Sequence, residues 1–121
     1  MKVLIVDDDV WQLDLLTREL RKAGFAVETA TNSYAAIKKL DGVYVPDVAV
    51  IDLLLPGANG ITLLHEIRSY QDLATLPVIV VSSSHVSLKS LAAYGVARVF
   101  DKASIAPGEL ALAVREVAHE G

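Results

Sequence analysis

The chain has 121 residues, which fits a single domain, and a domain of this length buries roughly two-thirds of its unfolded surface. Hydrophobic residues make up 53% and charged residues 21%, which excludes an intrinsically disordered chain. The formal net charge is -4, and no run of Lys or Arg forms a basic patch, so we expect no direct nucleic-acid binding. Cysteine is absent, which excludes disulfides and thiolate sites. With no apolar stretch long enough for a signal peptide or membrane span, we expect a soluble cytoplasmic protein.

Five short apolar runs predict five strands. In chain order they are Val3 to Val6, Ala26 to Ala30, Val48 to Ile51, Val78 to Val81, and Ala97 to Phe100. Most are continuously apolar rather than alternating, which is typical of strands buried on both faces of a parallel sheet.

The segments between these runs have helical spacing. Two apolar stripes at intervals of three and four residues predict the first and last helices: Leu13, Leu16 and Leu20, then Leu110, Val114 and Val117. The order is β-α repeated five times, which predicts an α/β fold. We expect residues 1–121 to form one (βα)5 domain, a doubly wound parallel sheet with helices on both faces.

Residues typical of helix ends support these boundaries. Asp9 and Gln12 resemble a capping box at the start of the first helix, and Pro107 suits the first turn of the last one. Three glycines fall where the preceding helices should end, namely Gly24, Gly42 and Gly95.

Chemically active side chains follow four of the five predicted strands. They are Asp7, Asp8 and Asp9 after the first, Asp52 after the third, Ser82 to Ser84 after the fourth, and Lys102 after the fifth. In open parallel sheets ligands bind beyond the carboxyl ends of the strands, so these groups should share one edge. Asp9 is interpreted as an N-cap residue rather than as a ligand.

The carboxylates of Asp7, Asp8 and Asp52 would repel one another at that edge, and a hard divalent cation would relieve the repulsion. Mg²⁺ is typically held by one or two carboxylates together with phosphate oxygens. Beside such a metal, Asp52 could attack phosphorus as a nucleophile. Lys102 and the Ser82 hydroxyl would then bind oxygens of the transferred group.

Four segments of the chain resemble the receiver domains of bacterial response regulators. They are Leu4-Ile5-Val6-Asp7-Asp8, Val50-Ile51-Asp52 followed by Pro56 and Gly60, Pro77 to Ser82, and Phe100-Asp101-Lys102. The resemblance covers the whole chain and implies a flavodoxin-like sheet with strand order 2-1-3-4-5.

The resemblance also implies a role for each site residue. Asp52 would be the phosphoacceptor, and Asp8 and Asp52 would be direct Mg²⁺ ligands. Asp7 would hold the ion through water, and the Leu54 backbone carbonyl would complete the ligands. Ser82 would be the switch hydroxyl and Lys102 the phosphate-binding lysine.

The implied function is phosphorelay signal transduction by a switch that catalyses only its own phosphorylation and dephosphorylation. The phosphoryl donor would be a sensor histidine kinase or a histidine phosphotransfer protein. The switch would change binding of an output target through the face formed by the fourth helix, fifth strand and fifth helix. This face is also the candidate surface for a homodimer.

The chain departs from the family pattern at several positions. Val99 stands where a switch aromatic is usual, and Ala103 stands where the phosphate-binding lysine is usually followed by proline. Leu54 and Ser84 occupy two positions that tune acyl-phosphate hydrolysis in the family, and neither is acidic or an amide.

Two other functions fit parts of the sequence. Asp7 and Asp9 form a D-x-D pattern like that of haloacid dehalogenase phosphatases, although Trp11 stands where that family has threonine. A phosphate-independent binding module that keeps only the receiver fold is the other alternative.

Overall fold

The computed structural model describes residues 1–41, 44–53, 60–83 and 88–120. Strands and helices alternate along the chain. The elements are β1 (Lys2–Val6), α1 (Val10–Lys22), β2 (Ala26–Ala30), α2 (Ser33–Leu40), β3 (Val48–Ile51), α3 (Gly60–Ser69), β4 (Val78–Ser82), α4 (Leu88–Leu91), β5 (Val96–Asp101) and α5 (Glu109–Glu120). Two short 3-10 turns, Gln71–Leu73 and Ala92–Tyr94, follow α3 and α4. Among the described residues, no helix has the length and apolar character needed to cross a membrane.

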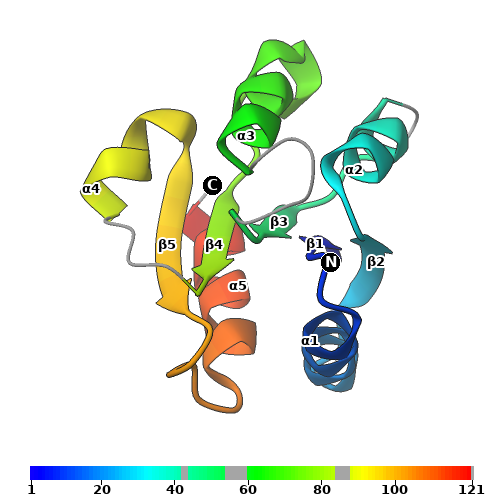
Figure 1. The fold of residues 1–121 in the computed structure, drawn as a ribbon, viewed down its shortest axis with the longest axis vertical. Coiled ribbons are helices and arrows are strands. Elements are labelled where there is room, and N and C mark those ends of the chain that lie inside the picture. Colours follow the sequence, from blue (N-terminus) through cyan, green and yellow to red (C-terminus); the bar gives the residue numbers. More distant parts are fainter. Residues whose placement is uncertain (42–43, 54–59, 84–87, 121) are drawn as a thin grey trace.

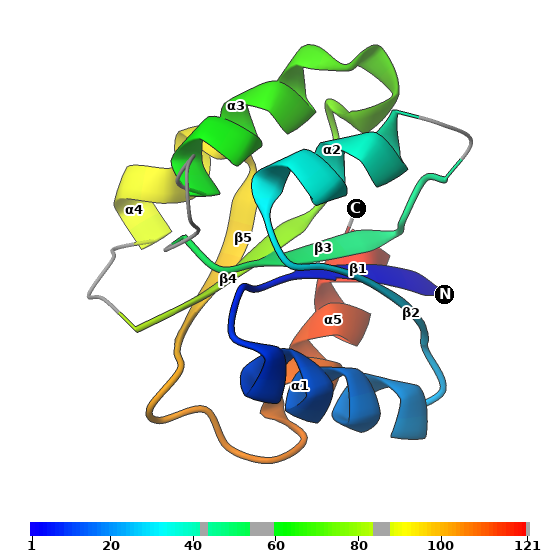
Figure 2. The same ribbon diagram turned by 45° about the vertical axis from the view of Figure 1, so that its right-hand side comes forward.

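The five strands form one parallel sheet, as the apolar runs predict, in the order β2-β1-β3-β4-β5 that the family resemblance implies. The helices lie in two layers. Figure 2 shows α2, α3 and α4 on one face of the sheet and α1 and α5 on the other. Figure 1 shows the same sheet from another side, with α1 beside β1 and β2 and α5 behind β4.

Apolar side chains fill the space between the sheet and each layer of helices. The layer formed by α1 and α5 buries both predicted stripes, which are Leu13, Leu16 and Leu20, and Leu110, Val114 and Val117. Each fully buried aliphatic side chain of this size stabilises the fold by roughly 1.5–3 kcal/mol. The three central strands are buried on both faces, whereas the edge strand β2 alternates between buried and exposed residues. The continuous apolar pattern therefore holds for the strands that have a neighbour on each side.

The caps of α1 agree only in part with the predicted capping box. The Asp9 side chain accepts hydrogen bonds from the backbone N–H groups of Trp11 and Gln12, as expected for an N-cap. The Asp9 N–H donates to Asp7 Oδ1 at 2.9 Å, so this donor is taken by a carboxylate of the strand end. At its other end α1 stops at Lys22, and Gly24 follows the C-cap residue Ala23 with a φ of 98°, which favours glycine.

The predicted position of Pro107 in the first turn of α5 is wrong. The helix begins at Glu109, whose N–H donates to Ala106 O at 3.1 Å and closes a turn over Pro107 and Gly108. Gly108 has a φ of 83°, so this is the Pro-Gly pattern of a type II turn. The predicted stop at Gly42 lies outside the described residues.

Arg68, near the end of α3, joins that helix to the chain on either side of β4. Its guanidinium donates to four backbone carbonyls, those of Leu73, Ala74, Tyr94 and Gly95. A Cβ atom on Gly95 would overlap the guanidinium, and the φ of 78° there also favours glycine. Gly95 thus ends the turn after α4, as predicted, and leaves room for Arg68.

Candidate functional site

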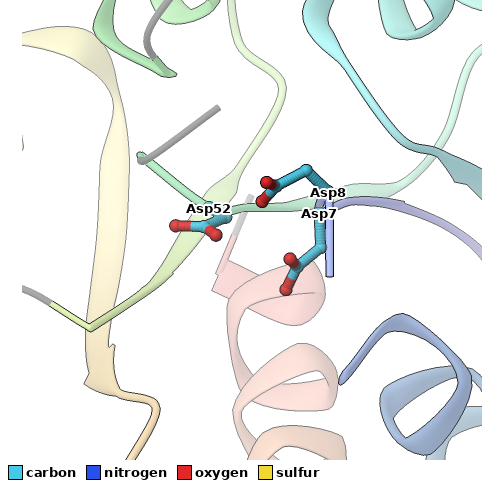
Figure 3. Close-up of side chains that lie close together, drawn as sticks. All are labelled: Asp7, Asp8 and Asp52. Atoms are coloured by element: carbon cyan, nitrogen blue, oxygen red, sulfur yellow. The ribbon is translucent and has the colours of Figure 1, made fainter. Parts of the chain in front are cut away.

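Three carboxylates meet at the carboxyl ends of the neighbouring strands β1 and β3. Asp7 and Asp8 follow β1 directly, and Asp52 follows β3. The Asp52 N–H donates to Val6 O at 2.9 Å, which continues the parallel ladder and sets Asp52 beside the end of β1. Figure 3 shows the three side chains gathered at this edge, where each offers an oxygen atom within 4.8 Å of the others. The sequence predicted this arrangement from the positions of the strand ends.

The three carboxylates differ in their exposure to solvent. Asp7 and Asp52 are 2% and 4% exposed, whereas Asp8 is exposed. Burial raises the pKa of Asp7, and this effect outweighs the opposing hydrogen bonds from the Asp9 N–H and from Lys102. Burial therefore makes ionisation of Asp7 less favourable in the folded protein than in the unfolded chain.

Lys102 reaches this acidic edge from the end of β5. Its ammonium group lies 2.8 Å from Asp52 Oδ2 and 3.0 Å from Asp7 Oδ2, and its side chain is only 16% exposed. Burial by itself lowers the pKa of Lys102, but its hydrogen bonds with Asp52 and Asp7 outweigh that effect and raise the pKa overall. Lys102 therefore stays charged and contacts both buried carboxylates.

The charges at this site do not balance. Three carboxylates and one ammonium group give a formal charge of -2. All donor atoms are oxygens, which Mg²⁺ and Ca²⁺ prefer over nitrogen and sulfur ligands. The described residues therefore fit a hard divalent cation.

Ser82 is fully buried as the last residue of β4, one position inside the strand rather than after it. Its carbonyl accepts a hydrogen bond from the Lys102 N–H at 3.0 Å, so the two residues lie on adjacent strand ends. Asp9, by contrast, acts as the N-cap of α1 and is not in the acidic group. Leu54 and Ser84 lie outside the described residues.

Two residues that depart from the family pattern, Val99 on β5 and Ala103 after it, have defined contacts in the structure. Val99 packs with the apolar side chains on the α2 and α3 face of the sheet. The Ala103 N–H donates to Asp101 Oδ1 at 2.9 Å, a bond that proline could not form.

Two residues that shape the site were not singled out as such from the sequence. Gly60 donates to Leu53 O at 2.9 Å, and a Cβ atom on it would lie 2.7 Å from Leu53 Cα and 2.8 Å from Asp52 O. The start of α3 therefore packs directly on the backbone that follows β3. Asp101 is the other residue, through its contact with Ala103. No local signal in the sequence indicates the contact of Gly60, whereas an aspartate that can accept from the N–H two residues on is a local turn signal at Asp101.

Comparisons with known proteins agree with this geometry. A family model described as the response regulator receiver domain matches residues 3–115. The chain is 39% identical over 75 residues to a transcriptional regulatory protein of Haemophilus influenzae, a CpxR homolog, covering 62% of this chain and 32% of that protein. The chain thus spans about a third of the length of the first curated relatives it matches.

Solved structures show the same fold over nearly the whole chain. A putative response regulator from Chloroflexus aurantiacus is 30% identical with a TM-score of 0.87, covering 98% of this chain and 97% of that chain. The response regulator TrrA from Thermotoga maritima, solved in complex with Mg²⁺-BeF, is 27% identical with a TM-score of 0.80, covering 96% and 97%. The family match shows, in agreement with the sheet order and the acidic group at the strand ends, that the chain belongs to the response regulator receiver domain family.

Proposed function

We propose that this domain is a phosphorylation-dependent signalling switch whose phosphoacceptor is Asp52. The observation that carries the proposal is the contact of Lys102 with Asp52 and Asp7 at the edge where Asp8 completes an acidic group. A buried carboxylate beside both a lysine and a cation site combines a nucleophile with groups that neutralise phosphoryl oxygens.

In the proposed reaction a carboxylate oxygen of Asp52 attacks the phosphorus of a phosphohistidine. The new O–P bond forms as the N–P bond breaks, and the released imidazole takes up a proton. Lys102, already 2.8 Å from Asp52 Oδ2, moves its hydrogen bond from the carboxylate to an oxygen of the transferred group. The hydroxyl of Ser82 donates to another of these oxygens, as the family resemblance implies.

The proposed cofactor is Mg²⁺, held by Asp8 and Asp52 directly, by Asp7 through water and by the Leu54 carbonyl. Bound there, the ion would offset the negative charge of the carboxylates and of the incoming phosphoryl group. The fit of Asp7, Asp8 and Asp52 to a hard cation supports this proposal, as does the Mg²⁺-BeF complex of TrrA. The role of Leu54 stays a prediction.

The proposed donor is a sensor histidine kinase or a histidine phosphotransfer protein in the cytoplasm. The proposed readout is altered binding of an output target through α4, β5 and α5, and dimerisation through this face stays a prediction. Neither alternative function gains support. A phosphatase of the D-x-D type would need the carboxylate of Asp9 in the site, but this carboxylate caps α1 instead. A phosphate-independent module gives no reason for the contact of Lys102 with two buried carboxylates.

The test is intact-protein mass spectrometry after incubation with acetyl phosphate, with Mg²⁺ or with a chelator. We expect the wild type to gain one phosphoryl group only when Mg²⁺ is present. Asp52→Asn should gain none, and Lys102→Ala should react more slowly. Asp14→Asn is the matched control, because Asp14 pairs with Arg18 on the exposed surface of α1 and should leave the reaction unchanged. Phosphorylation of Asp52→Asn, or of the wild type without Mg²⁺, would contradict the proposal.

A further inference from the structure

The position of Lys102 depends on how β5 pairs with β4. Along this pair the register shifts between the first two partners, because Val78 pairs with Val96 whereas the next residue, Ile79, pairs with Arg98. The extra residue is Ala97, so β5 contains a β-bulge.

Because of the bulge, each residue of β4 from Ile79 onward pairs with a residue of β5 that lies one position later in the sequence than the Val78–Val96 pair would give. Asp101 therefore pairs with Ser82, and the N–H of Lys102 donates to the Ser82 carbonyl at 3.0 Å. One residue of strand spans about 3.3 Å, so without the extra residue Lys102 would lie that far beyond this position. A displacement of this size would break the contacts of its ammonium group with Asp52 and Asp7.

The chain turns immediately after Asp101. The N–H of Ser104 donates to the Asp101 backbone oxygen at 3.1 Å, and the N–H of Ala103 donates to Asp101 Oδ1 at 2.9 Å. Lys102 is thus the central residue of a turn that the Asp101 side chain closes. The backbone at Lys102 is therefore held in two ways. Its own N–H is bonded to the Ser82 carbonyl, and the N–H of the next residue is bonded to the Asp101 side chain.

We propose that Asp101 is a positioning residue for Lys102, and that it acts through its hydrogen bond to the Ala103 N–H rather than through its charge. This inference rests on the proposed function, because it presupposes that Lys102 binds the transferred phosphoryl group. A proline at position 103 would have no N–H to donate and would restrict the turn through its fixed φ instead. In this chain the Asp101 side chain provides the restriction that proline would provide.

The test compares phosphorylation rate constants from acetyl phosphate at saturating Mg²⁺. Asp101→Ala should react about three to ten times more slowly, which corresponds to the net contribution of one hydrogen bond. Asp101→Asn keeps an oxygen acceptor but lacks the charge, so its rate should stay close to that of the wild type. Asp47→Ala is the matched control, because Asp47 accepts a backbone hydrogen bond from Lys2, outside the site, and the rate should not change.

A second comparison uses Ala103→Pro, which removes the N–H donor. In that background Asp101→Ala should have little further effect on the rate. Amide hydrogen exchange supplies a readout that does not depend on phosphorylation. Exchange at the Ala103 amide should speed up in Asp101→Ala and stay slow in Asp101→Asn. This measurement tests whether the Asp101 oxygen holds the Ala103 N–H even if the proline variant does not fold.

Three results would overturn the inference. They are equal slowing by Asp101→Ala and Asp101→Asn, slowing by Asp101→Ala that persists in the Ala103→Pro background, and a wild-type rate in Asp101→Ala. Failure of the proposed function has a different signature, because Lys102→Ala would then react as fast as the wild type, or Asp52→Asn would still be phosphorylated.

Discussion

Replacing Asp7 with asparagine should stabilise the protein when no divalent cation is present. The substitution removes one buried negative charge and keeps the shape of the side chain. The amide oxygen can still accept the hydrogen bond from the Asp9 N–H, which is 2.9 Å long in the wild type. Any change in stability therefore reports mainly on the charge.

The expected magnitude follows from the neighbours of Asp7. Its carboxylate oxygen lies within 4.8 Å of oxygens of Asp8 and Asp52, and each such pair repels by about 3.5 kcal/mol at an effective dielectric near 20. Solvent screens the repulsion from Asp8 further, because Asp8 is exposed. The ammonium group of Lys102, 3.0 Å away, attracts Asp7 by about 5.5 kcal/mol at the same dielectric.

These Coulomb energies nearly cancel, so the lost hydration of the buried carboxylate decides the sign. Burial is the largest cause of the raised pKa of Asp7. We expect Asp7→Asn to gain on the order of 1 kcal/mol in the free energy of unfolding at neutral pH, or roughly 4 °C in Tm for a domain of this size.

The pH dependence has a defined sign. The pKa of Asp7 in the folded protein lies above its ordinary value of 3.8. At pH values between the ordinary and the raised pKa, the folded state therefore binds more protons than the unfolded state. The stability that protonated Asp7 contributes is complete below pH 3.8 and is lost as the pH rises through the raised pKa. Asparagine does not titrate, so the advantage of Asp7→Asn should grow from acid toward neutral pH.

Urea unfolding followed by circular dichroism, with a chelator and at several pH values, measures this difference. Asp47→Asn is the control, since Asp47 lies outside the acidic group. Added Mg²⁺ should then stabilise the wild type more than Asp7→Asn, because the ion binds the folded site in preference to the unfolded chain. The reasoning would be refuted by a wild type more stable than Asp7→Asn in chelator at neutral pH, or by an advantage that shrinks as the pH rises.

Three further predictions test other parts of the structure. Gly60→Ala should destabilise the fold by roughly 2 kcal/mol or more, because the new Cβ would lie 2.7 Å from Leu53 Cα, and urea unfolding checks this against the wild type. Arg68→Gln should lose roughly 2 kcal/mol of stability, since its guanidinium donates to four backbone carbonyls; unfolding at the wild-type urea midpoint would contradict that role. The raised pKa of Lys102 means that its stabilising charge is fully present below pH 10.5 and is lost as the pH rises through the higher folded value. Lys102→Met should therefore show a shallower loss of stability in an alkaline denaturation series, and an equally steep loss would argue against this role for the charge.

Much of the fold could be predicted from the sequence because its signals are local. A continuous apolar run marks a central strand wherever helices cover both faces of a sheet, and this holds for β1, β3 and β4. The edge strands follow the rule less well, since each has only one neighbour.

The acidic group was predictable for a related reason. In a parallel sheet every strand points the same way, so residues that follow different strands meet at one edge. Asp7 and Asp8 after β1 therefore had to lie near Asp52 after β3, whatever the details of packing.

The sequence by itself thus determined the order of the elements, the faces that they bury and the set of side chains at the acidic edge, because each of these follows from local patterns and a topological rule. Only the tertiary structure decided the contacts that depend on how distant segments align. The bulge at Ala97 sets the register of β5, and that register brings Lys102 to Asp7 and Asp52 together. The close approach of Gly60 to the backbone of Leu53 likewise depends on how α3 docks. A shift of one residue, about 3.3 Å along a strand, leaves the local pattern almost unchanged but moves a side chain out of hydrogen-bonding reach, so no pattern of neighbouring residues can specify it.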